Sequence, residues 1–79
     1  MAIEYKKNLA RFSDVVSVEE AEGLLEWLQN KSSAKINLSA CSHLHPANLQ
    51  VLMAAKPIIS AWPDDASLRA WLMSSLNSN

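Results

Sequence analysis

The chain is poor in several residue types, and each scarcity excludes a class of protein. Its 79 residues include one Gly, three Pro and one Cys. A single cysteine cannot form an internal disulfide, and no stretch approaches the ~18 apolar residues of a membrane-spanning helix. Charged residues also interrupt the first fourteen positions, where a signal peptide needs an unbroken apolar region. We therefore expect a cytoplasmic protein without membrane insertion.

An excess of charge of either sign is missing as well. The 7 Lys and Arg residues nearly balance the 8 Asp and Glu residues, which gives a net charge of −1 and a pI of about 6.0. Such a balance predicts no basic patch for a nucleic acid and no polybasic patch for an acidic membrane. We therefore expect the partner to be another protein and not a nucleic acid.

What the chain does contain is apolar sequence in regular patterns. Its hydrophobic content of 49% is enough for a packed core and is typical of one small domain spanning residues 1–79. Short apolar alternations predict strands, and apolar residues three and four positions apart predict helices. The expected strands are 3–7, 9–16, 34–39 and 58–62, and the expected helices begin at Ser17, Pro46 and Asp64. The fold class is therefore α/β, with one sheet of about four parallel or mixed strands and three helices in the order ββαβαβα.

Each expected helix has a start signal and an apolar stripe. Ser17-Val18-Glu19-Glu20 is a capping box, Pro46 suits a first helical position, and Asp64 is the expected N-cap of the last helix. Trp27 is expected at the edge of the core, and Met73 at the surface. The stripes expected to be buried are Ala21, Leu24, Leu25 and Leu28, then Leu49, Leu52 and Met53, and finally Leu68, Trp71, Leu72 and Leu76.

The central stretch from Ile36 to Ala55 reads INLSACSHLHPANLQVLMAA. A short apolar strand leads into a polar turn over residues 40–45, and a helix follows from the proline. This stretch resembles the central signature of the STAS domain family, the anti-sigma-factor antagonists and their relatives, in which a strand ending in Asp-Leu-Ser precedes Asp-Ser-Ser-Gly-Leu at a helix start. The resemblance implies a STAS-like fold and a bacterial regulatory module that binds a regulatory or transport protein, without catalysis and without a cofactor.

The chain departs from that signature where the family carries its switch. The phosphorylatable Ser or Thr of the family falls on Ala47 here. Pro46 and Asn48 replace its Ser and Gly neighbours, His45 replaces the Asp before them, and Asn37 replaces the Asp of the strand. Because Ala47 has no hydroxyl, phosphorylation cannot add charge at this helix start. The resemblance therefore implies docking without a phosphate switch at that position.

The expected contact surface follows from the same resemblance. It comprises the turn and the helix start: Ser42, His43, Leu44, His45, Pro46, Ala47, Asn48 and Gln50. On this hypothesis, Asn48→Arg abolishes partner binding and leaves the fold unchanged. Ser39 and Ser42 are either modified or simply hydrogen-bonded within the turn, and the sequence leaves both open.

Two alternatives to this function come from the residues themselves. Cys41, His43 and His45 stand at i, i+2 and i+4 of an extended segment, where they would share one side and offer ligands to zinc or copper. A structural zinc needs a fourth ligand, which Asp64 or Asp65 would have to supply. Without a metal, Cys41 is expected to be a small buried residue, and His45 a polar residue at the helix start. The other alternative is an oligomerisation unit, such as a homodimer.

Catalysis is not expected from this sequence. A nucleophilic Cys41 or serine would need an oriented base and a group that orients that base. No Gly-rich elbow or oxyanion-binding loop surrounds the histidines. The sequence therefore predicts a non-enzymatic protein.

Overall fold

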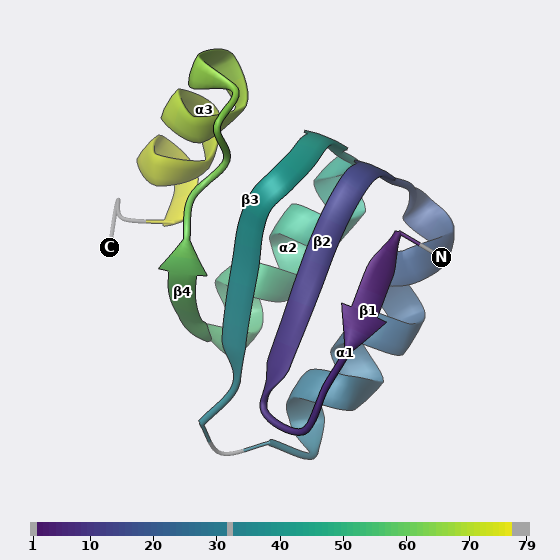
Figure 1. Ribbon diagram of the computed structural model, residues 1–79. Coiled ribbons are helices and arrows are strands. Elements are labelled where there is room, and N and C mark those ends of the chain that lie inside the picture. The colour runs from purple at the N-terminus through teal and green to yellow at the C-terminus, as the bar shows by residue number, and fades with distance from the viewer. Residues whose placement is uncertain (1, 32, 77–79) are drawn as a thin grey trace.

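The computed structural model describes residues 2–31 and 33–76, and within them it shows one four-stranded sheet with three α-helices (Figure 1). The strands are β1 (Ile3–Tyr5), β2 (Leu9–Val16), β3 (Lys35–Leu44) and β4 (Ile58–Ala61). The helices are α1 (Ala21–Gln29), α2 (Pro46–Ala55) and α3 (Ala66–Leu76), and a short 3-10 helix, η1 (Val18–Glu20), precedes α1. The predicted α/β class, mixed sheet and element order are confirmed.

The sheet is covered by helices on one face. Its strand order is β1-β2-β3-β4, with β1 antiparallel to β2 and the other pairs parallel. Because right-handed crossovers in one direction place their helices on the same side of a sheet, α1 and α2 share a face. Figure 1 shows both behind the sheet and α3 beside β4. The opposite face bears mainly polar residues, such as the cross-strand neighbours Glu4, Arg11 and Asn37.

The core lies between the sheet and these two helices. Phe12, Ile36 and Leu38 point to it from the strands, and Leu24 and Leu52 from the helices, all at 0% exposure. Full burial of such a side chain stabilises a fold by about 1.5–3 kcal/mol. The core therefore fixes how α1 and α2 sit on the strands, and with them the start of α2.

Strand β3 is longer than predicted because two bulges interrupt its alternation. Between Arg11 and Ser13 of β2, and again between Asp14 and Val15, β3 contributes one more residue than its partner. Asp14, next to the second bulge, has a φ of 54°. The buried positions of β3 fall at 36, 38, 41 and 44, which does not match a period of two. The polar turn predicted over residues 40–45 is therefore wrong: pairing continues to Leu44, and His45 alone joins β3 to α2.

Three predicted core residues lie at the surface. Leu25, Met53 and Trp71 are 39%, 38% and 40% exposed. The reason is that each helix buries a stripe narrower than predicted, such as Leu68 and Leu72 on α3. Trp27 does pack at the edge of the core, with its ring centroid 5.3 Å from that of Tyr5, and Met73 is exposed, as predicted.

Two predicted helix caps differ in the structure. The Ser17 hydroxyl makes no capping hydrogen bond; instead the Ser17 carbonyl accepts from the Glu20 N–H at 3.1 Å. At α3 the cap is Asp65 and not Asp64, since Asp65 Oδ1 accepts from the Leu68 N–H at 2.8 Å. Helical structure still begins close to the predicted positions, since η1 begins one residue after Ser17 and α3 begins two residues after Asp64.

Candidate functional site

The start of α2 lies at the carboxyl edge of the parallel strands and is capped by a histidine. His45 has an extended backbone, and its Nδ1 accepts a hydrogen bond of 3.0 Å from the Ala47 N–H. Pro46 occupies the first helical turn, where its missing N–H leaves no intrahelical bond unmade. The expectation that His45 serves as a polar residue at the helix start is confirmed.

Asn48 ties this helix start to the end of β2. Its side chain is 0% exposed, and Nδ2 donates to the Ser17 carbonyl at 2.8 Å and to the Val16 carbonyl at 3.4 Å. These two acceptors fix the orientation of the amide, because the reverse orientation would place Oδ1 against carbonyl oxygens. The Val16 carbonyl also accepts from the His45 N–H at 2.9 Å. The first turn of α2 is therefore held on the sheet by buried hydrogen bonds.

The predicted contact surface is only partly at the surface. Leu44 and Asn48 are 1% and 0% exposed, so neither can touch a partner, and including them was wrong. Both side chains point inward, one into the core and the other to the end of β2. The expectation that Asn48→Arg leaves the fold unchanged is also wrong, because the substitution would bury a charged guanidinium, which destabilises the fold. The remaining residues are exposed or half-buried: Ser42, His43, His45, Pro46, Ala47 and Gln50.

The exposed side of α2 carries no charge. None of its ten residues is charged, yet Pro46, Gln50, Met53 and Ala54 are exposed. We call these four residues the outer face of α2. The prediction of a buried Met53 missed this face, although the absence of Lys, Arg, Asp and Glu from Pro46 to Ala55 was a visible signal in the sequence.

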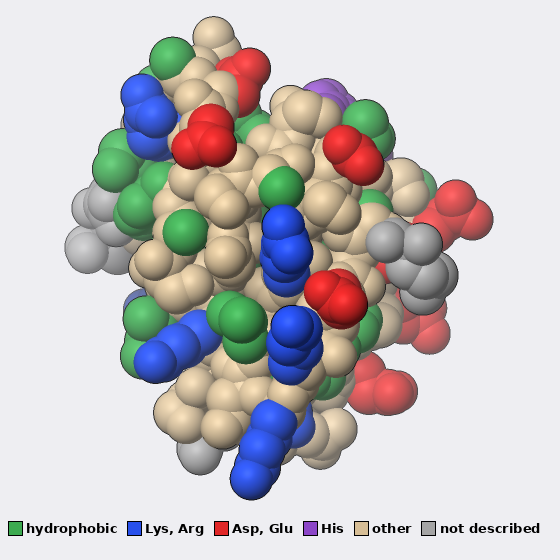
Figure 2. Space-filling model, in the orientation of Figure 1, with side chains coloured by type: hydrophobic (Ala, Val, Ile, Leu, Met, Phe, Trp, Pro, Cys, Tyr) green, Lys and Arg blue, Asp and Glu red, His purple; other side chains and the backbone are tan. Residues whose placement is uncertain are grey.

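Exposed valines add apolar groups on the β2 side of this helix start, beside the exposed Asp14 and Glu19. Val15 pairs with His43 across β2 and β3 and is 56% exposed, and Val18 in η1 is 52% exposed. At the upper edge of Figure 2, a histidine lies beside a hydrophobic side chain, with an acidic side chain below it. The carboxyl edge thus presents apolar and imidazole groups close to the helix start.

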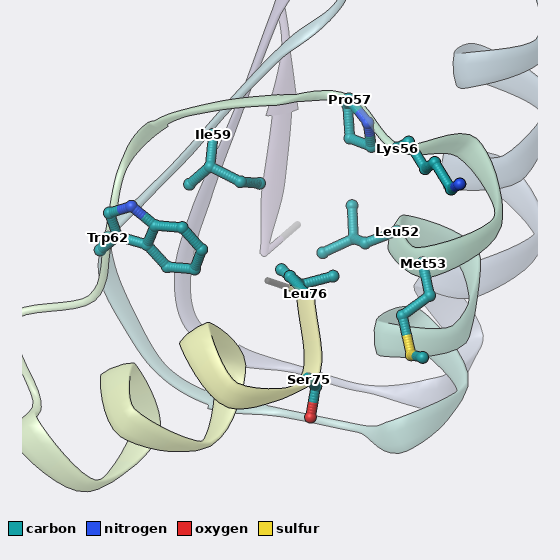
Figure 3. A pocket seen from close by; sticks show the side chains of 8 residues that line it. All are labelled: Leu52, Met53, Lys56, Pro57, Ile59, Trp62, Ser75 and Leu76. Atoms are coloured by element: carbon teal, nitrogen blue, oxygen red, sulfur yellow. The ribbon is translucent and has the colours of Figure 1, made fainter. Parts of the chain in front are cut away.

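A hollow opens at the other end of α2, between that helix, β4 and α3. Its volume is 380 Å³. Figure 3 shows Leu52, Ile59 and Leu76 pointing into it, with the Trp62 ring on one side and Met53 on the other. Lys56, Pro57 and Ser75 complete its lining. The outer face of α2 therefore runs from the helix start to the rim of this hollow, which Met53 also lines.

The three residues considered as metal ligands are not brought together. Cys41 is 2% exposed, and its thiol lies within 3.4 Å of the His43 carbonyl oxygen. The His43 side chain is exposed, and His45 Nδ1 is occupied by the Ala47 N–H. Within residues 2–31 and 33–76, no group of three or more His, Cys, Asp or Glu is placed to hold a metal ion. The expectation that Cys41 is a small buried residue is confirmed.

The Cys41 thiol is also unsuited to nucleophilic attack. Burial raises its pKa above the ordinary value, a smaller lowering comes from the hydrogen bond to the His43 backbone, and the Asp14 carboxylate raises it further. Because the thiolate is the nucleophile, a raised pKa and a buried sulfur both reduce reactivity. The Cys41 thiol at the carboxyl edge is therefore not an activated nucleophile.

No family model matches the chain, and neither a curated protein nor a solved structure gives a significant match. None of the helices within the described residues is both long and apolar enough to cross a bilayer.

Proposed function

We propose that the chain is a STAS-like protein–protein interaction module that docks a regulatory or transport protein through the start and the outer face of α2. The proposal has no catalytic step, no cofactor and no phosphate switch at Ala47, and it places the module in the cytoplasm of a bacterial cell. The observation that carries it is the outer face of α2, which is exposed yet has no charged residue. Helix faces that meet only water are normally charged or polar, whereas the centres of protein interfaces are depleted in charge and enriched in Met.

The rigidity of the helix start supports docking there. Asn48 and the His45 backbone fix the first turn of α2 on β2, so the exposed groups around them need little further ordering when a partner binds. Pre-ordered side chains reduce the entropy lost on association. Pro46 adds to this effect, because its ring fixes the backbone φ.

The order of the elements is a second support. The strand pair, the helix, and the alternating strands and helices follow the order that the STAS resemblance implies. In that order α2 begins directly after β3, where the family docks its partners. The resemblance and the uncharged helix face thus point to the same surface.

The test is a comparison of bound proteins between the wild type and a surface variant. We expect His43→Ala/Gln50→Ala to lose a protein that the wild type retains from a lysate of its own cell. Once purified, that protein should bind the variant at least tenfold more weakly, because hot-spot residues cost at least about 1.4 kcal/mol each on truncation. Binding is measured by isothermal titration calorimetry.

The matched control is Glu4→Ala/Glu26→Ala, which changes two exposed residues away from α2. It should bind the purified partner as the wild type does, and the far-UV circular dichroism of all three proteins should agree. Equal binding by the wild type and by His43→Ala/Gln50→Ala would remove the start of α2 from the proposal.

A further inference from the structure

The fold separates charges that nearly cancel in the sequence. All five lysines lie at the end of the sheet where β2, β3 and β4 begin: Lys6 and Lys7 between β1 and β2, Lys31 after α1, Lys35 as the first residue of β3, and Lys56 before β4. Figure 1 shows these segments together at the lower end, and most blue side chains lie in the lower half of Figure 2. A nearly balanced composition does not reveal this separation, because the separation arises from the fold. We call this region the lysine end.

The opposite end carries most of the carboxylates. Six of the eight acidic residues lie near or just after the carboxyl ends of β2 and β4: Asp14, Glu19, Glu20, Glu22, Asp64 and Asp65. The exposed Val15 and Val18 stand among them. Red side chains border the upper and right sides of Figure 2. We call this region the acidic end.

The lysine end also has a small hollow of mixed lining. It lies between the end of α1 and the start of β4, has a volume of 140 Å³, and is lined in part by Leu28, Pro57 and Ile58. Lys31 and Lys56 belong to the same lining, and no Asp or Glu is among the described residues that form it. Ile58 is 56% exposed. The lysine end therefore combines positive charge with space for an apolar side chain.

We propose that the lysine end docks the acidic end of a second copy of this chain, head to tail. Each end has what the other lacks: one offers lysines around a hollow, and the other offers carboxylates around the exposed Val15 and Val18. A head-to-tail contact leaves one lysine end and one acidic end free on every pair, so the contact repeats along a row of copies.

Phosphate-bearing partners fit the lysine end less well. Arginine is the side chain that binds phosphate through two parallel hydrogen bonds, and both arginines lie elsewhere, Arg11 within β2 and Arg69 within α3. A nucleic acid would also leave the hollow unfilled. The acidic end of a second copy meets both the charge and the hollow.

The size of the molecule predicts a weak contact. Its extents are 30 × 29 × 20 Å, so an end face offers less than roughly 900 Å² per copy, near or below the ~800 Å² of a standard stable interface. A small contact guided by charge responds strongly to salt. Self-association should therefore be concentration-dependent and weaken roughly tenfold or more between about 0.01 M and about 1 M salt.

The experiment is sedimentation velocity on purified protein over a range of concentrations at low and high salt. Two variants weaken the charge of one end each. Lys35→Glu/Lys56→Glu leaves the lysine end with three positive and two negative side chains, and Glu19→Lys/Asp64→Lys leaves the acidic end with four negative and two positive ones. We expect the wild type to self-associate at low salt and each variant alone to associate at least roughly tenfold more weakly, because the attraction between its two ends is reduced. An equimolar mixture of the two variants should associate more strongly than either variant alone, since each supplies the unaltered end that the other lacks.

The matched control is Glu4→Lys/Glu26→Lys, which changes the net charge as the acidic-end variant does but at exposed residues of β1 and α1 that belong to neither named end. It should associate like the wild type, and circular dichroism should show that all variants are folded. A monomeric wild type at low salt, an end variant that alone associates as strongly as the wild type, or a mixture that associates no more strongly than either variant alone would each overturn the proposal. Binding of a DNA duplex or of phosphatidylserine vesicles by a monomeric wild type would overturn it in favour of a phosphate-bearing partner.

This contact can fail without affecting the function proposed above. The lysine end is not part of the start or the outer face of α2. The variant Lys35→Glu/Lys56→Glu should therefore self-associate more weakly and keep the partner that His43→Ala/Gln50→Ala loses.

Discussion

The two edges of the parallel strands are held together in different ways. At the carboxyl edge, side chains bond to the backbone: His45 caps α2, Asn48 bonds to the carbonyls at the end of β2, and Asp65 caps α3. At the amino edge, backbone bonds to backbone, as from the Lys35 N–H to the Asn8 carbonyl at 2.8 Å and from the Ile58 N–H to the Ala34 carbonyl at 3.1 Å. A hydrogen bond made by a side chain depends on the residue type at that position, whereas almost any residue can make a backbone hydrogen bond. Lysines can therefore occupy the amino edge without loss of its hydrogen bonds, whereas the carboxyl edge depends on Asn48.

The largest change in stability is expected on substitution of Asn48, at the carboxyl edge. Asn48→Ala removes both hydrogen bonds of a buried amide, to the Val16 and Ser17 carbonyls, and should lower the free energy of unfolding by about 2 kcal/mol, since one such bond contributes about 0.5–1.5 kcal/mol. Urea unfolding followed by circular dichroism measures the change. Gln50→Ala, at an exposed position of the same helix, should stay within about 0.5 kcal/mol of the wild type. If the two variants are equally stable, the amide does not hold the carboxyl edge.

A smaller effect is expected at the start of α3, where two adjacent aspartates differ in role. Asp65→Ala removes the acceptor of the Leu68 N–H and should lower the free energy of unfolding by about 1 kcal/mol. Asp64→Ala removes only a charge near the helix start, which is worth about 0.3–1 kcal/mol and is screened by salt. Thermal unfolding at high salt separates the two variants. A greater loss of stability for Asp64→Ala would show that Asp64 is the N-cap, as predicted from the sequence.

The smallest effect is expected at the amino edge and has the opposite sign. Lys56 ends α2 in the left-handed conformation, with φ of 51°, where glycine has no steric cost. Lys56→Gly should therefore raise the free energy of unfolding by about 0.5 kcal/mol, measured at high salt so that charge contributes little. Lys35→Gly, inside β3, should lower it by about 0.5–1 kcal/mol. Destabilisation by Lys56→Gly would mean that the lysine side chain itself holds this edge.

The fold could be predicted because its main signals are local. Apolar periodicity located every strand and helix, and Pro46 marked the start of α2 correctly. The length of β3 could not be predicted in this way, because its two bulges depend on pairing with β2 and hide the strand within a polar-looking segment. A strand with two extra residues looks like a strand followed by a turn when the partner is unknown.

The candidate site was predicted less well because its determinants are distant in the sequence. Asparagine is usually exposed. The carbonyls that accept hydrogen bonds from the buried Asn48 side chain lie 31 and 32 positions earlier in the chain. The separation of lysines from carboxylates likewise depends on which connections meet at one end of the sheet. The uncharged face of α2 is different, since the absence of charged residues between Pro46 and Ala55 was visible from the start.

The bond from Asn48 to the end of β2 also bears on how the protein opens and closes. The first turn of a helix usually frays on its own, because its amide groups have no partners within the helix. Here that turn shares hydrogen bonds with β2, so it cannot open without loosening the end of a central strand. Local unfolding at the proposed docking surface is therefore coupled to the sheet, and the surface keeps its shape for as long as the strands remain paired.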